Sequence, residues 1–524
     1  MIFSSIYFTF LFLPIVLLLY YVIRGRARNI VLLLASLIFY AYGEPVFVFV
    51  LMGSVIINYL LALGIAGGRK SAVSEKNVPD HITGNSGEEN PTDKTQSILQ
   101  DKANNEQIRQ KKSAMTKALL ILAVILNIGL LFVYKYLYFG ITLLNLIPQV
   151  NFPGKEIALP IGISFFTFQA LSYVIDVYRG EQPQKNPLNL GLYICFFPQL
   201  IAGPIVRYHD ISEQLCDPER FSAKPSYLLS TDFADGVERF LIGFSKKVLL
   251  ANQLAVIADT VFDAEDFAAV SPGMAWLGSI CFTLQIYYDF SGYSDMAIGL
   301  GKMFGFTFLE NFNYPYIASS ITDFWRRWHM SLSGWFRDYV YIPLGGGRVK
   351  TGRRIWNLFV VWLLTGLWHG ANLTFVAWGL LYFVFLVLEK YVIKPERFGK
   401  AAAKALYRVF TLAVVNFLWV LFRAKDLTAG MAYLASMFGA GAVSGTEGAA
   451  VQAVISAPAG WYEMMLRQYG VFLLAAVIFA MPLRTLFKRK EKTCISAVLL
   501  LFAFLWSVSY LILGAHNPFL YFNF

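Results

Sequence analysis

Residues 355–388, IWNLFVVWLLTGLWHGANLTFVAWGLLYFVFLVL, set the architecture of this chain. Basic clusters flank the segment at 348–354 and 390–397. Because basic loops stay on the cytoplasmic side of a membrane, both ends are expected there, and the segment must enter the membrane and return. Gly366 and the sequence HGAN at 369–372 provide the predicted turn, which leaves legs of about 11 and 16 residues, roughly 16 and 24 Å of helix.

These short legs put a polar turn at membrane depth. Neither leg comfortably crosses a hydrocarbon core about 30 Å thick, so His369 is predicted to lie inside the protein and to be reached from the cytoplasmic side. Polar backbone at that depth is tolerated only where protein buries it or a water-filled cavity faces it. His369 is therefore a candidate functional residue, although a hydrogen-bonded structural histidine would explain the same sequence.

The composition of the whole chain agrees with membrane insertion. Of its 524 residues, 57% are hydrophobic and only 15% are charged, which excludes an ordinary soluble protein. Recurring apolar runs predict an all-α polytopic membrane protein with about 10–12 transmembrane or re-entrant helices. The formal net charge of +11 comes from short basic loops beside the predicted spans, so no nucleic-acid partner is expected.

Two stretches outside the predicted spans divide the chain. Residues 68–117 contain no aromatic side chain and have basic edges, which predicts a disordered cytoplasmic loop. Residues 426–469 carry few charges and are predicted to be external. The expected organisation is N-terminal membrane helices at 1–67, the loop at 68–117, a core at 118–388 with an interfacial segment at 310–354, and C-terminal membrane helices at 389–524 with the external loop 426–469.

The sequence DFWRRWHMSLSGWFRDYVYIPLGGGR, residues 323–348, combines tryptophans with arginines. This composition is typical of a segment at the cytoplasmic membrane interface, with its rings in the headgroup zone and its arginines facing water or lipid phosphate. Within the predicted spans, polar groups could line a tunnel or join helices by hydrogen bonds, and the sequence leaves both open for Gln169, Asp176, Gln285, Asp289 and Asp295.

Five blocks of sequence identify a family resemblance. They are LPIGISFFTFQALSYVIDVYRG (159–180), FFPQLIAGPIVR (196–207), YYDFSGYSDMAIGLGKMFGF (287–306), ENFNYPYIASSITDFWRRWHMSLSGWFRDYVYIPLGGGR (310–348) and GLWHGANLTFVAWG (366–379). With them the chain resembles the membrane-bound O-acyltransferases, or MBOAT family. The likeness is greatest to the bacterial branch that serves alginate O-acetylation, and more distant to the proteins that transfer D-alanine to teichoic acids.

The resemblance implies a fold, a reaction and two site residues. Helices would surround a central tunnel that leads from the cytoplasm to the histidine of the WHG turn, which is His369. The histidine of the RRWH block corresponds to His329. The implied reaction passes an acetyl group from cytoplasmic acetyl-CoA across the cytoplasmic membrane of a bacterium to an extracytoplasmic polysaccharide such as alginate, cellulose or peptidoglycan. A separate extracytoplasmic acetyltransferase of the SGNH type would complete the transfer.

Acyl transfer from a thioester needs a base for the attacking hydroxyl and a group that stabilises the oxyanion. Imidazole suits the first task, and the candidates to orient His369 are His329, Asn372 or a backbone carbonyl. His329 could assist catalysis, bind a substrate or hold the segment in place. Arginines at the tunnel mouth would suit the phosphates of acetyl-CoA, and the candidates are Arg326, Arg327, Arg337 and Arg348.

No permanently bound cofactor and no metal site are predicted, since the cysteines and histidines lack metal-ligand spacing. Two other functions remain as alternatives. One is a lysophospholipid or protein O-acyltransferase of the same family. The other is a secondary transporter, which the absence of visible internal repeats disfavours.

Overall fold

The computed structural model describes residues 1–74, 113–222, 230–267, 270–440, 461–482, 494–514, 516–518 and 520. Every regular element within these residues is a helix. Six described segments are long and apolar enough to cross a membrane: Phe47–Gly68, Ser113–Leu144, Thr231–Phe262, Leu373–Arg397, Ala401–Arg423 and Ile495–Ile512. The prediction of an all-α membrane protein is therefore confirmed.

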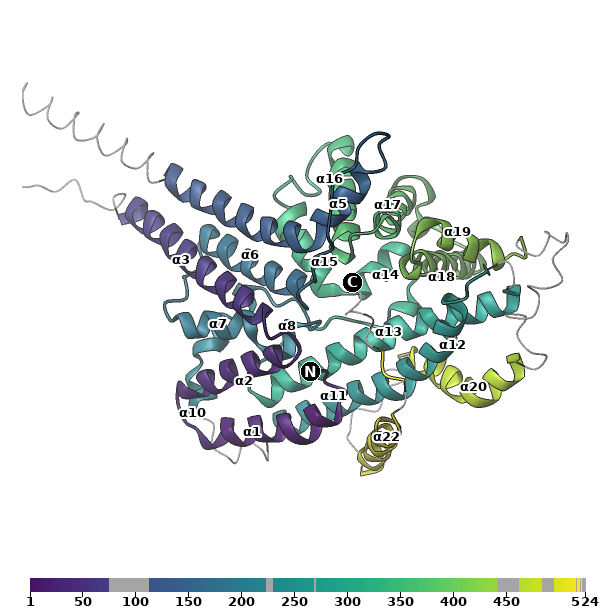
Figure 1. Cartoon of the computed structure of the whole chain (residues 1–524), viewed down its shortest axis with the longest axis horizontal. Helices are drawn as coiled ribbons and strands as arrows, with labels where there is room; N and C mark the ends of the chain where they lie inside the picture. Colours follow the sequence, from purple (N-terminus) through teal and green to yellow (C-terminus); the bar gives the residue numbers. More distant parts are fainter. Residues whose placement is uncertain are drawn as a thin grey trace, which may run out of the picture.

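The helices and their order are shown in Figure 1. In chain order they are α1 (Leu13–Val22), α2 (Ala27–Gly43), α3 (Phe47–Ser74), α5 (Leu137–Leu144), α6 (Ile163–Arg179), α7 (Pro187–Cys195), α8 (Phe197–Leu200), α9 (Tyr208–Ile211), α10 (Pro218–Ser222), α11 (Thr231–Ser245), α12 (Asn252–Phe262), α13 (Pro272–Met303), α14 (Ile321–Arg327), α15 (Met330–Phe336), α16 (Thr351–His369), α17 (Leu373–Leu388), α18 (Ala401–Arg423), α19 (Leu427–Ser436), α20 (Trp461–Phe479) and α22 (Cys494–Ile512). Wider turns continue several of them as η3 (Phe132–Tyr136), η6 (Lys246–Ala251), η9 (Arg337–Tyr341) and η10 (Glu389–Ile393).

The long helix α13 runs through the middle of the molecule beside α11 and α12 (Figure 1). Glycines allow α11 and α13 to touch. A Cβ atom on Gly236 would lie 2.8 Å from the carbonyl oxygen of Gly299, and one on Gly299 would lie 2.5 Å from that of Gly236. Gly243 and Gly292 make the same kind of contact seven residues away along each helix. Small residues at such spacing bring membrane helices into close backbone contact, and this pair forms the centre of the fold.

Buried acidic residues of α13 join it to its neighbours. Asp289 forms an ion pair with Lys247 at 2.5 Å. Asp295 binds Arg239 at 2.7 Å and Lys246 at 2.7 Å. Of the two possibilities for these aspartates, the structure therefore supports pairing between helices. A buried pair of this kind is costly to break from one side, because the remaining charge would lose its partner.

Helix α3 and the segment Ser113–Leu144 lie side by side as a long pair (Figure 1). Asn127 donates to Asn58 at 2.7 Å, and Asn58 donates back at 3.1 Å. Because α3 continues to Ser74 and the second helix begins at Ser113, both edges of the predicted loop 68–117 are helical. The rest of that loop lies outside the described residues. In the predicted external loop 426–469, α19 and the start of α20 are helical, and 441–460 also lies outside them.

The tryptophans of the predicted interfacial segment 310–354 are buried by protein, whereas the sequence predicts that they face the lipid headgroups. Trp325, Trp328 and Trp335 are only 8%, 2% and 4% exposed, so their rings do not lie in a headgroup zone. Instead they pack inside the protein, where Trp335 stacks on Phe168 with ring centroids 3.7 Å apart. The segment is amphipathic as expected, but its apolar face is covered by other helices rather than by lipid.

Candidate active site

Helices α16 and α17 form the hairpin that carries His369. The first leg is 19 residues long rather than the predicted 11, while the second has the predicted 16. Gly366 lies within α16, and the turn falls between His369 and Leu373. A Cβ atom on Gly366 would lie 2.5 Å from the carbonyl oxygen of Phe375. The prediction that Gly366 makes the turn is therefore wrong: this glycine allows the two legs to pack closely.

His369 ends α16 in an aromatic enclosure. Its side chain is buried, and its ring lies 4.9 Å from Trp368, 5.1 Å from Trp378 and 5.0 Å from Phe422 between centroids. The Nδ1 atom has no hydrogen-bond partner among the described residues. Asn372, a predicted orienting partner, instead accepts from the amide of Thr374 at 3.0 Å and begins α17. Van der Waals contact, not a hydrogen bond at Nδ1, holds this imidazole in place.

His329 lies close to the same site. It precedes α15 with a left-handed φ of 44°, a conformation that residues with a Cβ rarely adopt. It is 1% exposed, and neither ring nitrogen has a hydrogen-bond partner in the part of the chain that the structure describes. Its ring centroid lies 5.7 Å from that of Trp368, the indole that also contacts His369. The structure thus brings the two predicted histidines together around one tryptophan.

Lys135 joins this site from η3, although the sequence analysis does not select it. Its Nζ atom donates to the carbonyl oxygens of Trp368 at 2.5 Å and His369 at 3.3 Å, and to Ser164 Oγ at 3.2 Å. These carbonyls belong to the last turn of α16, where a helix leaves its acceptors unpaired and favours a cation. A lysine that is the lone charge in an apolar run of 27 residues, 118–144, is the signal that could have found it.

Two cavities adjoin α16. A small one of about 40 Å³ is lined by Lys135, Ser164 and His369 together with neighbours from 159–165. A large one of about 1000 Å³ extends along the helix and reaches Thr365, which precedes His369 by one helical turn. The α16 residues that line the large cavity recur every three or four positions, on the face that carries His369: Leu358, Val361, Trp362 and Thr365.

An aromatic cluster of Trp325, Trp362, Trp378 and Trp419 connects the large cavity with His369. The rings of Trp325 and Trp362 line the cavity and lie 4.7 Å apart. Trp378 lies 5.6 Å from Trp325 and 5.1 Å from His369. Trp419 completes the cluster at 5.9 Å from Trp378. The cluster thus lies between the cavity lining and His369 and makes the surroundings of this histidine apolar.

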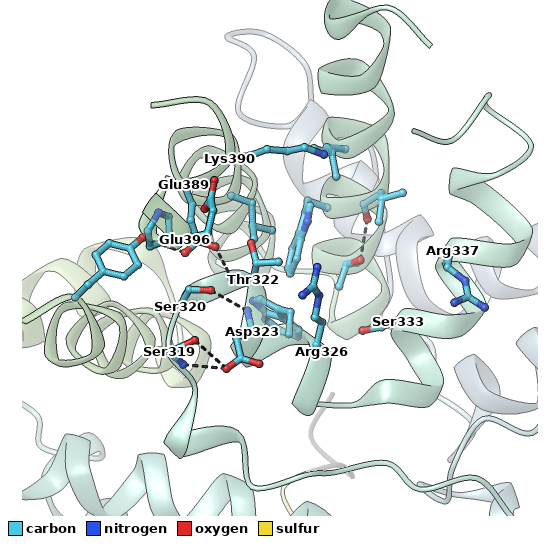
Figure 2. Close-up of a pocket in the computed structure, with 18 of the residues that line it drawn as sticks. Ser319, Ser320, Thr322, Asp323, Arg326, Ser333, Arg337, Glu389, Lys390 and Glu396 are labelled. Carbon is cyan, nitrogen blue, oxygen red and sulfur yellow. Dashed lines mark hydrogen bonds between the residues drawn. The ribbon is translucent and has the colours of Figure 1, made fainter. Parts of the chain in front are cut away.

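The predicted arginines divide into two groups. Arg326 and Arg337 line the large cavity with Lys390, and Figure 2 shows the three cations on separate segments around it. Arg327 binds Asp323 at 2.8 Å instead, and Arg348 is exposed outside both cavities. The structure therefore brings two of the four arginines to the cavity.

Glu389 fixes the segment that carries Arg326. Its carboxylate accepts from the amides of Ile321 at 2.7 Å and Thr322 at 2.8 Å, at the first turn of α14 (Figure 2). A carboxylate in this position satisfies amides that the helix itself cannot pair. Glu389 is buried in the cavity lining and is committed to this cap. The rest of the lining carries five cationic side chains and the two carboxylates of Asp323 and Glu396, so cations outnumber anions there.

A third histidine, His209, lies in a polar network away from both cavities. Its Nδ1 atom lies 3.0 Å from Asp176 and its Nε2 atom 3.3 Å from Asp210. Tyr339 donates to Asp176 at 2.8 Å, and Arg207 binds Asp210 at 2.8 Å. The hydrogen bonds to the two carboxylates raise the pKa of His209 to about 9. This histidine carries a positive charge at neutral pH and holds α6 against α9.

Among the described residues, no group of three or more His, Cys, Asp or Glu side chains could hold a metal ion. An all-α membrane protein with two buried imidazoles beside a large, partly cationic cavity has the architecture of a membrane-embedded transferase. The MBOAT, membrane-bound O-acyltransferase family model matches residues 184–433. The "Probable alginate O-acetylase AlgI" of Pseudomonas aeruginosa is 40% identical over 448 residues, which cover 84% of this chain and 75% of that relative. The chain belongs to the MBOAT family and is an O-acyltransferase.

Other relatives differ in the polymer that their names specify. The peptidoglycan O-acetyltransferase of Helicobacter pylori is 35% identical over 475 residues, covering 85% of this chain and 81% of the relative. The teichoic acid D-alanyltransferase of Bacillus subtilis is 29% identical over 285 residues, covering 52% of this chain and 70% of the relative. Membership of the MBOAT family does not support a secondary transporter, the less favoured of the two alternatives. The region matched by the family model includes both His329 and His369.

Proposed function

We propose that this enzyme passes an acetyl group from cytoplasmic acetyl-CoA across the bacterial cytoplasmic membrane, for O-acetylation of an extracytoplasmic polysaccharide. The observation that carries the proposal is the location of His369, at the end of the α16 face that lines the large cavity and at the edge of a second, small cavity. Relatives named for the O-acetylation of alginate and peptidoglycan support acetyl as the transferred group.

The large cavity is the proposed donor site. Its volume of about 1000 Å³ suits a ligand of the size of a nucleotide cofactor. Arg326 and Arg337 would bind the phosphates of acetyl-CoA, since guanidinium groups form paired hydrogen bonds with phosphate oxygens. The acetyl end would then extend past Thr365 toward His369, while the aromatic cluster keeps water from the thioester.

His369 is the proposed general base. Its imidazole accepts the proton of the attacking hydroxyl, and the hydroxyl oxygen forms a bond to the acetyl carbon. The carbon–sulfur bond then breaks, and the departing thiolate takes the proton from His369. His329, which contacts the same indole, is proposed as the second catalytic histidine. The Nδ1 atom of His369 has no partner within the described chain, although a buried imidazole normally satisfies both nitrogens. This unpaired atom supports the proposed role of His369 as the base.

The acceptor is proposed to reach the enzyme through a separate extracytoplasmic acetyltransferase of the SGNH type. The described residues form helices only, so a hydrolase-like domain with a sheet is not among them. The proposed docking surface is the predicted external segment 426–469, of which 426–440 and 461–469 are described, or the external ends of the helices. Efficient acetylation of polysaccharide by the purified chain alone would contradict this part of the proposal.

Acyl transfer in membrane vesicles tests the function. Vesicles that expose the cytoplasmic face receive radiolabelled acetyl-CoA, and the wild type is compared with His369→Ala and His329→Ala at matched expression. We expect label on an acceptor at the opposite face, and we expect His369→Ala to abolish it. Label that enters lipid would favour the lysophospholipid acyltransferase instead, and undiminished transfer by His369→Ala would refute the mechanism.

A further inference from the structure

The small cavity beside His369 is lined by the hydroxyl group of Ser164. Counting the protons and acceptors around Lys135 shows whether this hydroxyl donates or accepts its hydrogen bond to the lysine. Burial disfavours a charged lysine, but two carbonyl oxygens at the C-terminal end of α16 favour the ammonium form of Lys135, which carries three protons. Three acceptors surround it, namely the carbonyl oxygens of Trp368 and His369 and the Oγ atom of Ser164. Each of the three protons of Lys135 therefore has its own acceptor, and the Oγ atom of Ser164 accepts one of these protons.

A serine hydroxyl that accepts from lysine still has its own proton to donate. In the described part of the chain, no hydrogen bond with Ser164 Oγ as the donor is formed. Ser164 is 8% exposed and lies at the start of α6, where it lines the small cavity with His369. The free O–H group is thus confined to a small, buried site that also contains the buried imidazole of His369.

The cation makes this hydroxyl a stronger donor. Hydrogen bonds polarise one another in a low-dielectric interior, so an ammonium bound to the serine oxygen increases the positive character of its proton. The same ammonium is held at the C-terminal end of α16 by two carbonyl oxygens, where the helix dipole favours positive charge. Lys135 consequently fixes two groups at once, the backbone of His369 and the hydroxyl of Ser164.

We propose that Ser164 is a catalytic hydrogen-bond donor to the oxyanion that forms at the transferred acyl carbon, and that Lys135 is the positioning residue that directs the Ser164 hydroxyl. This inference rests on the proposed function. When the acceptor oxygen attacks, the carbonyl π electrons move to the carbonyl oxygen, and Ser164 donates a hydrogen bond without giving up its proton. When the carbon–sulfur bond breaks, the carbonyl re-forms and the hydrogen bond weakens. A hydrogen-bond donor that is already positioned for the oxyanion stabilises the transition state more than the bound substrate, and it therefore raises kcat.

The test compares Ser164→Ala with a matched control on the same helix. Ser172 is also buried in α6, but its hydroxyl donates to the carbonyl oxygen of Gln169 at 2.8 Å. In the vesicle assay with acetyl-CoA, we expect Ser164→Ala to lower kcat by about 10²-fold while KM changes less than about twofold. Ser172→Ala should retain the wild-type kcat. Ser164→Thr keeps the hydroxyl and should recover most of the lost rate.

Lys135→Met provides a second arm that separates positioning from structure. Lys135→Met should lower kcat at least as much as Ser164→Ala, because it also removes the donor to the carbonyl oxygens of Trp368 and His369. Adding Ser164→Ala to Lys135→Met should lower kcat little further, and the two effects should not multiply. A kcat above half the wild-type value in Ser164→Ala, or an equal loss in Ser172→Ala, would overturn the inference. If His369→Ala remains active in the same vesicles, the proposed function itself fails. If His369→Ala is inactive while Ser164→Ala is not, only the present inference fails.

Discussion

His369 and His209 lie in opposite surroundings within one chain. His369 is buried among aromatic rings, and its Nδ1 atom has no partner among the described residues. His209 is 36% exposed and has a carboxylate at each ring nitrogen. Leaving a buried polar atom unpaired costs free energy, whereas a paired imidazole stabilises the helices it joins. The comparison agrees with the proposed role of His369 as a base, whereas His209 forms a structural contact between α6 and α9.

Exchange of each histidine for glutamine tests the comparison most directly. We expect His369→Gln to lower kcat by about 10²- to 10⁴-fold, the usual contribution of a general base. His209→Gln should leave kcat within about threefold of the wild type, because this side chain lies outside both cavities. The vesicle assay measures both variants. Similar losses in the two variants would remove the distinction between a chemical and a structural histidine.

The helix hairpin that carries His369 depends on backbone proximity rather than on hydrogen bonds between side chains. Gly366→Ala would put a methyl group 2.5 Å from the carbonyl oxygen of Phe375. We expect a loss of about 2 kcal/mol in stability, since overpacking of this kind typically costs 1–3 kcal/mol. Thermal unfolding in detergent measures the effect. Gly352→Ala is the matched control in the same helix, because its Cβ would meet nothing within 4 Å. An equal melting temperature for both variants would contradict the packing argument.

The cationic side chains that line the large cavity should influence binding rather than chemistry. Arg326→Gln removes a charge that lines the large cavity, and we expect the KM for acetyl-CoA to rise by up to about fivefold, because an exposed charge pair contributes up to about 1 kcal/mol. The increase should shrink at high salt, which screens exposed charges. Arg348→Gln removes a charge outside the cavity and should leave KM unchanged. A lower kcat at constant KM in Arg326→Gln would contradict a role in donor binding.

The smallest expected effect is the pH dependence of the His209 network. Hydrogen bonds to Asp176 and Asp210 raise the pKa of His209 from 6.5 to about 9. Its contribution to stability is therefore complete below about pH 6.5 and is lost as the pH rises through about 9. His209→Gln should lower stability at pH 6 by less than about 1 kcal/mol and should have no effect near pH 10. Melting temperatures across this range provide the measurement, and a loss that grows with pH would contradict the assignment.

The sequence could predict those parts of the molecule that depend on local pattern. Hydropathy and charge are sufficient to predict a helical membrane protein. They also predict a helical hairpin with His369 at its turn. The burial of Trp325 and Trp335 was wrongly predicted, because an interfacial helix and a helix covered by protein have the same amphipathic composition. The sequence predicts a turn at Gly366 and at HGAN, 369–372, and the structure has the turn at HGAN alone. Gly366 misleads because glycine can break a helix but also permits close helix packing. The contact between Lys135 and the carbonyl oxygens of α16 joins residues more than 230 positions apart, and no local pattern encodes it.

The aromatic cluster beside His369 also gives the enzyme an optical signature. Four indoles with neighbouring centroids 4.7 to 6.3 Å apart couple their electronic transitions, so they should produce a strong near-ultraviolet circular dichroism signal. Trp325 and Trp362 line the large cavity, while Trp378 contacts His369. A ligand that enters this cavity must change the surroundings of the coupled rings. Occupancy of the donor site can therefore be followed in the unlabelled protein, without an attached dye and without turnover.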